Sequence, residues 1–156
     1  MKKITSLLTV CIMLALISCG SQKKKEQEQE KNLFSESMAL HDEVMPKQEE
    51  LFSLKNKINT LGTKMDSLKK ANPTLDTSAL RTTITGISAK IDTASNHMSD
   101  WMHNFTSDLD EKFQNKSHEE IMNYLKKGKE DIEKVKQEFN QSISEAKQFI
   151  DEQKIK

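Results

Sequence analysis

Three long stretches of this chain carry apolar or small residues almost entirely at alternating steps of three and four. The first stretch runs through Leu33, Leu40, Val44, Leu51, Leu54, Ile58, Leu61, Met65 and Leu68. The second runs through Leu80, Ile84, Ile87, Ile91, Ala94, Met98, Trp101 and Phe105. The third runs through Ile121, Leu125, Gly128, Ile132, Val135, Phe139, Ser142 and Ala146. This spacing forms one stripe on an α-helix, whereas a strand would need alternation at every second residue.

The three stretches are separated by helix-ending signals. Asn72 precedes a proline, which disfavours helix in the residue before it. A polar stretch over 107–116 is followed by Ser117 and Glu120, which have the spacing of a helix capping box. The sequence therefore predicts an all-α fold, an elongated antiparallel up-down-up three-helix bundle or coiled coil. The expected helices cover about 32–71, 74–106 and 117–153, and Pro46 should kink the first helix or start a new segment of it.

Composition agrees with helix and argues against several functions. Four Gly and two Pro in 156 residues provide few turns for a sandwich or barrel. The 24 basic residues balance the 24 acidic ones, and Arg81 is the only arginine, so we expect no nucleic-acid partner. The apolar stripes are narrow, and the flank of the first helix is also apolar. We therefore expect a protein partner or self-association to cover Phe34, Met38, Met45 and Phe52.

The N-terminus has the form of an export signal. Lys2 and Lys3 precede an uncharged, mostly apolar run over 4–17, which is too short to span a bilayer as a mature helix. The residues Leu-Ile-Ser-Cys-Gly at 16–20 resemble the lipobox of bacterial lipoproteins. We expect 1–18 to be a signal peptide, Cys19 to be acylated and 19–31 to be a charged tether or a frayed helical lead-in. Gly20 favours the outer membrane, because it differs from the known inner-membrane retention signal.

Several segments of the mature chain resemble a protein family. These are Met38–Lys47, Asp100–His103, SHEEIMNYL at 117–125 and KVKQEFNQSISEAKQFI at 134–150. They look like a family of small Bacteroidetes lipoproteins whose members often carry the label "viral A-type inclusion protein". The resemblance implies a bacterium with two membranes. Because the family has no established activity, it supplies no catalytic residue.

The familiar catalytic patterns do not occur in this sequence. There is no Gly-rich elbow for a nucleophile and no Gly-rich phosphate loop. His118-Glu119 begins like a zinc-protease helix, but Met122 stands where the second histidine must be. We therefore expect a protein that is not an enzyme and needs no cofactor.

One cluster suggests a metal. His41 and Met45 lie on one side of the first helix, and Met98 and Met102 lie on one side of the second. Counting across a hairpin that turns near Asn72 brings these two pairs to the same level. Imidazole and thioether ligands suit copper, especially Cu(I). The simpler interpretation is that the methionines fill an irregular core anchored by Trp101.

The sequence thus predicts a lipid-anchored helical bundle of the cell envelope that acts as a non-enzymatic interaction or scaffold module. One alternative is an envelope protein that binds copper or a small ligand through the Met/His cluster. A further alternative is an envelope stress chaperone, for which strong dimerisation and a concave apolar face would be evidence.

Overall fold

In a computed structural model of the protein, the structure describes residues 2–105 and 109–153, with side chains described from Ser21 onward. These residues contain helices and turns and no strand, which confirms the all-α prediction. The helices are α1 (Lys2–Val44), α2 (Lys47–Thr63), α3 (Met65–Ala71), α4 (Thr77–Asn104), α5 (Leu109–Lys112) and α6 (His118–Glu152).

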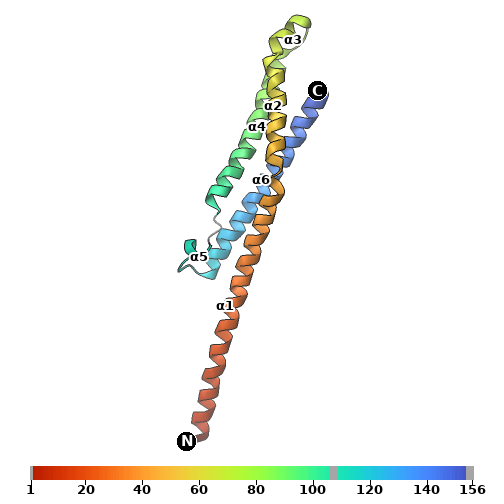
Figure 1. Ribbon diagram of the computed structural model, residues 1–156. Coiled ribbons are helices and arrows are strands. Elements are labelled where there is room, and N and C mark those ends of the chain that lie inside the picture. The colour runs from red at the N-terminus through yellow and green to blue at the C-terminus, as the bar shows by residue number, and fades with distance from the viewer. Residues whose placement is uncertain (1, 106–108, 154–156) are drawn as a thin grey trace.

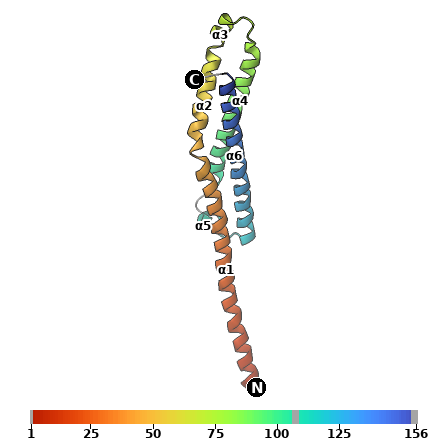
Figure 2. The ribbon, with the colours of Figure 1, turned by 90° about the vertical axis from the view of Figure 1, so that its right-hand side faces the viewer.

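The helices form an elongated bundle with the predicted up-down-up topology. In Figure 1, α1, α2 and α3 follow one another along a single rod, α4 returns beside it and α6 runs back in the direction of α1. Figure 2 shows the same arrangement from the side, with the N-terminal part of α1 extending beyond the other helices. Helix α6 packs against α1, α2 and α4, so it is the central helix of the bundle.

The rod formed by α1, α2 and α3, called the first rod below, is divided at two points where its helical hydrogen bonding is interrupted. Pro46 has no N–H, and α1 therefore ends at Val44 while α2 begins at Lys47. A second break lies at Lys64, whose N–H donates to the Leu61 carbonyl at 3.0 Å, three residues back. This tighter turn separates α2 from α3. The Pro46 break follows the prediction, whereas nothing in the sequence indicated the break at Lys64.

The connections that lead into α4 and α6 each end in a side-chain cap at the start of the helix. Asp76 Oδ1 accepts hydrogen bonds from the backbone N–H groups of Ser78 and Ala79, each at 3.0 Å, and α4 begins beside it. At the other end, Asn115 has a φ of 66°, a left-handed conformation that asparagine tolerates better than most residues. Ser117 follows as the N-cap of α6, with the predicted capping box formed with Glu120.

Polar contacts between helices define the register. Lys129, Lys136 and Asn140 of α6 contact Glu36, Glu43 and Lys47 at 2.7–2.8 Å, and each pair is separated by 93 residues. A constant separation means that α6 runs parallel to the first rod. By contrast, α2 contacts α4 through Gln48–Ser95, Lys55–Asp92 and Asn59–Ser88, in which one number rises as the other falls. These two helices are therefore antiparallel.

The core follows the apolar series. In the second series every residue except Leu80 is buried, and in the third every residue except Ile121. The first series contains a seven-residue step between Leu33 and Leu40, and the structure places Ser37 in that gap with no exposed surface. Its hydroxyl donates to the Leu33 carbonyl at 2.9 Å, so burial leaves this group paired.

Candidate functional site

Aromatic rings from three helices and a loop meet at the lower end of the bundle in Figure 1, where α4 ends and α6 begins. Trp101 stacks on Phe105 with 4.6 Å between ring centroids, and Phe105 also stacks on Phe34 at 5.4 Å and on Tyr124 at 5.8 Å. Phe113 meets Tyr124 edge-on at 4.8 Å. These five residues are called the aromatic cluster below. It fixes the positions of α1, α4 and α6 because each of these helices contributes at least one ring.

Gly128 of α6 forms the base of this cluster. The Trp101 indole N–H donates to the Gly128 carbonyl oxygen at 2.7 Å. A Cβ atom on Gly128 would lie 2.3 and 2.4 Å from two carbons of the Phe105 ring. Only glycine therefore allows the ring to lie this close to the α6 backbone.

Beside the cluster lies an open groove between α4 and α6, with a cavity of about 460 Å³. Its apolar base is formed by Trp101, Phe105, Gly128 and Val135. Its polar edges are formed by His97, Asp100, Asn104, Lys127, Asp131, Lys134 and Glu138, and Tyr124 lies at one end. Two smaller hollows continue between the same helices toward the other end of the bundle. This surface, called the α4–α6 groove, has a volume within the usual range of ligand sites.

Most of the charged groups along the groove are paired within the chain. His97 Nδ1 lies 2.7 Å from a Glu138 carboxylate oxygen, which joins α4 to α6 across the groove. Lys127 contacts Asp131 one turn away, and Lys134 lies 4.0 Å from the same carboxylate. The groove therefore combines an apolar base with solvent-exposed ion pairs, which contribute little to stability and can be exchanged for others at low cost.

The other flank of α6 is already used inside the bundle. Lys129, Lys136 and Lys147 contact carboxylates of α1 and α2 at 2.6–2.8 Å. The pKa of Lys129 is raised by its hydrogen bond to Glu36. The α1/α2 side of α6 is thus engaged in the fold, and the α4 side carries the open surface.

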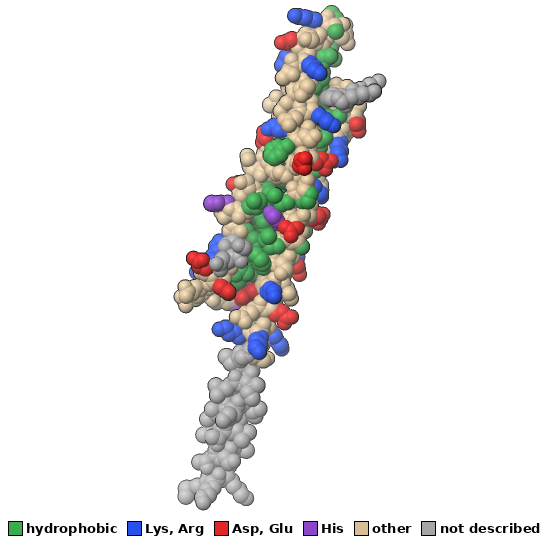
Figure 3. Space-filling view, viewed as in Figure 1, with side chains coloured by type: hydrophobic (Ala, Val, Ile, Leu, Met, Phe, Trp, Pro, Cys, Tyr) green, Lys and Arg blue, Asp and Glu red, His purple; other side chains and the backbone are tan. Residues whose placement is uncertain are grey.

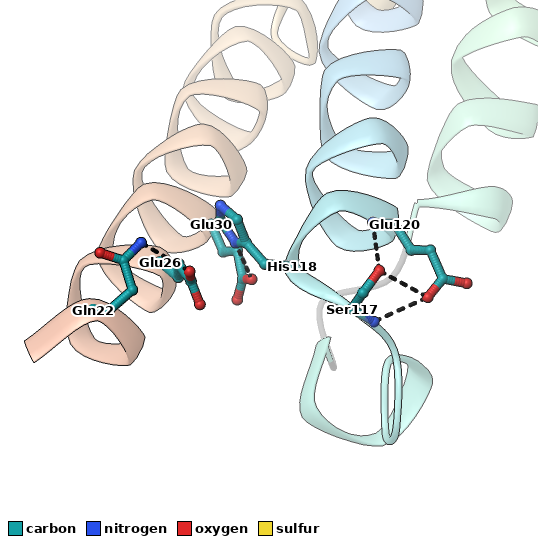
Figure 4. Close-up of polar contacts among 6 residues, drawn as sticks. All are labelled: Gln22, Glu26, Glu30, Ser117, His118 and Glu120. Atoms are coloured by element: carbon teal, nitrogen blue, oxygen red, sulfur yellow. Dashed lines mark hydrogen bonds and ion pairs between the residues drawn. The ribbon is translucent and has the colours of Figure 1, made fainter. Parts of the chain in front are cut away.

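The lower end of α6 is held by two polar contacts, shown in Figure 4. His118 Nδ1 lies 2.7 Å from Glu30 Oε1, and these side chains are 28% and 17% exposed, so the pair ties α1 to the start of α6. Nearby, the Ser117 backbone N–H donates to Glu120 at 2.9 Å. This bond, followed by those from Lys116 and the Ser117 hydroxyl, lowers the pKa of Glu120 to about 2.

The residues 19–31, predicted to form a charged tether or a helical lead-in, belong to the long helix α1. The part of 19–31 with described side chains lies in α1, where Gln22 donates to Glu26 at 3.0 Å. Together with the Glu30 contact, this makes the segment a helical lead-in up to the point where the bundle begins. It differs from a tether without secondary structure.

The predicted Met/His residues lie at the same end but in different environments. The His41 ring stacks on Trp101 at 5.5 Å, and its Nδ1 lies 2.9 Å from Asp42 Oδ1. Met98 is 2% exposed, Met45 packs partly buried against the core and Met102 is 47% exposed. Counting across the hairpin placed these parts of the first and second helices at the same level, and the contact between His41 of α1 and Trp101 of α4 agrees with that placement. Trp101 itself is only 7% exposed. Figure 3, viewed as in Figure 1, shows apolar side chains open to solvent beside the lower part of α4.

The flank of the first helix is less exposed than the sequence suggested. Phe34, Met38 and Met45 pack partly buried against the core, and Phe34 does so through its stacking on Phe105. Phe52 alone among these four is largely exposed, at 47%. The open surface that sequence reasoning missed is the α4–α6 groove, for which Gly128 within a helical apolar series was the available signal.

The predicted lipidation site, Cys19, lies outside the residues whose side chains the structure describes. Within the described part of the chain, no helix is long and apolar enough to cross a membrane. Over the same residues, no group of three or more His, Cys, Asp or Glu side chains is arranged to hold a metal ion.

Comparison of the chain with protein-family models, curated proteins and solved structures finds no match.

Proposed function

We propose that the protein is a lipid-anchored helical bundle of the cell envelope, held in the outer membrane through Cys19, and that it acts as a non-enzymatic interaction module through the α4–α6 groove. The observation that carries the proposal is the groove itself. It leaves an apolar base open along the line where α4 and α6 pack against each other.

The chemistry of the base favours binding over catalysis. The Trp101 indole N–H is used by the Gly128 carbonyl, and the Tyr124 hydroxyl donates to the Asn104 carbonyl at 2.6 Å. The polar groups of the aromatic cluster are therefore committed to the fold. The base offers apolar contact, and the paired charges at the edges offer orientation, which is the division of roles found in protein interfaces.

The anchor is supported by the sequence at 16–20, which resembles a lipobox, and by the charged run before the apolar segment. A signal peptide that ends before Cys19 would leave the lipid joined to the helical lead-in of α1. Two or three acyl chains hold a protein firmly at a bilayer, whereas one chain holds it only marginally.

The anchor and the groove are tested separately. A Cys19→Ala variant should lose acyl labelling and leave the membrane fraction, and a variant that is processed and retained normally would refute the lipid anchor. For the groove, a photo-crosslinking amino acid replaces Lys134 in cells, and Lys57 on α2 serves as the control position. Position 134 should form a defined protein adduct that position 57 does not, and the absence of this difference would refute the groove as a binding surface.

A further inference from the structure

A row of alternating charges lies along the α6 side of the α4–α6 groove. Lys127, Asp131, Lys134 and Glu138 follow one another at steps of four, three and four residues, and all four line the groove. These steps keep side chains on one face of a helix. Their side chains are 63%, 39%, 66% and 37% exposed, respectively, so a partner can reach them. They are called the groove row below.

The charges of the groove row match opposite charges in a second, antiparallel copy of the same row. When a second α6 lies antiparallel with its midpoint between residues 132 and 133, Lys127 faces Glu138 of the second copy and Asp131 faces Lys134. The two-fold axis repeats both pairs, so four attractive contacts form. A parallel arrangement would instead place each charge against its own kind, which costs energy at an interface.

We propose that a second copy of this chain occupies the α4–α6 groove, with the two α6 helices antiparallel about this axis. The inference rests on the groove being a binding surface and names its partner. The aliphatic stems of Lys127 and Lys134 of one copy would lie over the apolar base formed by Trp101 and Val135 of the other. Long basic side chains cover apolar surface in this way while their charged ends stay solvated.

Charges elsewhere on α6 do not offer the same match. Lys129, Lys136 and Lys147 are bound to acids of α1 and α2 inside the bundle. Just outside the groove row, Glu120 and Glu145 would face each other across the axis. Each is already engaged in its own chain, Glu120 by Ser117 and Glu145 by Lys90 at 2.6 Å, and the Lys90 hydrogen bond lowers the pKa of Glu145.

The arrangement has a consequence for the ends of the pair. Since α1 extends past the bundle at one end only (Figure 2), an antiparallel pair carries one N-terminal extension at each end. Two copies anchored in the same leaflet would therefore form this contact with their bundles lying along the membrane surface, and not with both bundles standing upright and parallel.

Disulfide trapping tests the pairing and its direction. The full chain carries Cys11→Ser and Cys19→Ser, so that introduced cysteines are the only thiols. Lys127→Cys and Glu138→Cys are made separately and oxidised alone or mixed. In the antiparallel pair, two copies of position 127 lie 11 residues apart along the helix, about 16 Å at ~1.5 Å per residue, which is too far for a disulfide. Position 127 should therefore bond to position 138 in the mixture and form little dimer alone.

Charge reversal tests the same contact without a covalent bond. Lys127→Glu and Glu138→Lys should each weaken dimerisation about tenfold, because two attractive pairs become repulsive. The double variant should return to within about threefold of the original chain, since opposite charges face each other again. Lys126→Glu, one position along α6, is the control and should leave dimerisation unchanged. Sedimentation equilibrium of the same Cys11→Ser, Cys19→Ser chain measures all four.

Two results would overturn the inference. One is efficient trapping by Lys127→Cys alone, which indicates a parallel pair, and the other is a mixture that forms no more dimer than Lys69→Cys with Glu138→Cys. If trapping fails while the photo-crosslinker at position 134 captures a different protein, the groove remains a binding surface and only the second copy is excluded. If both experiments fail, the proposed function fails with the inference.

Discussion

Replacing Gly128 with alanine should destabilise the protein, although alanine is the better helix former. In an open helical position, Gly→Ala stabilises by about 1 kcal/mol because the unfolded chain loses conformational freedom. At Gly128 the new Cβ would lie 2.3 Å from the Phe105 ring, a separation that neither a ring nor a helix backbone can accept. Overpacking of this kind costs about 1–3 kcal/mol.

A second contribution comes from Trp101. Its 2.7 Å hydrogen bond to the Gly128 carbonyl depends on the same close approach of α4 to α6. Loosening that bond costs about 1 kcal/mol. After the helix gain is subtracted, we expect Gly128→Ala to lower the free energy of unfolding by about 2 kcal/mol.

Gly86 provides the matched control. It also lies inside a helix, α4, but a Cβ there would meet nothing within 4 Å. Gly86→Ala should therefore raise the free energy of unfolding by about 1 kcal/mol, so that the two variants differ by about 3 kcal/mol. Urea denaturation followed by far-ultraviolet circular dichroism measures both. Fluorescence of Trp101, the only tryptophan, reports on the cluster itself.

The cause can be isolated with a double variant. Phe105→Leu removes the ring that the new Cβ would strike, so Gly128→Ala should cost at least 1 kcal/mol less in that background than in the original chain. If Gly128→Ala instead stabilises the protein as much as Gly86→Ala does, the close packing of Phe105 on α6 is not a determinant of this fold.

Four further variants test the helix cap, the core and the methionine cluster. The folded-state pKa of Glu120 is about 2, against an ordinary value of 4.5. Its contribution to the free energy of unfolding is therefore present above pH 4.5 and is lost as the pH falls toward 2. Glu120→Gln should therefore flatten the acid side of the stability profile, and an unchanged profile would contradict the capping geometry. Ile91→Asp, at a site with no exposed surface, should cost about 4 kcal/mol or more and abolish the cooperative unfolding transition. If the methionines only pack, Met45→Leu and Met102→Leu should each cost less than about 1.5 kcal/mol, and calorimetry should detect no stoichiometric copper binding. A one-to-one complex with copper at micromolar affinity or better would instead establish the metal site.

Local sequence predicted the three long helical stretches and the two connections between them, but it indicated neither the break at Lys64 nor the short helix α5. The apolar series of α4 and α6 are nearly continuous, and the structure buries almost every member of both. Asp76 and Ser117 begin their helices because a side-chain oxygen can satisfy backbone N–H groups two or three residues ahead. Such interactions span a single turn, so the residues that make them are adjacent in the sequence.

The surfaces between the helices depended on the tertiary structure. Ser37 and Gly128 look like interruptions of an apolar series, yet each is buried, Gly128 beneath the Phe105 ring. Phe34 was expected on an outer flank but stacks on Phe105 across the bundle. The positions of these residues are set by how closely α1, α4 and α6 approach one another, and those distances depend on side chains far apart in the sequence. The α4–α6 groove exists for the same reason, because periodicity determines which face of a helix is apolar but not which part of that face its neighbours cover.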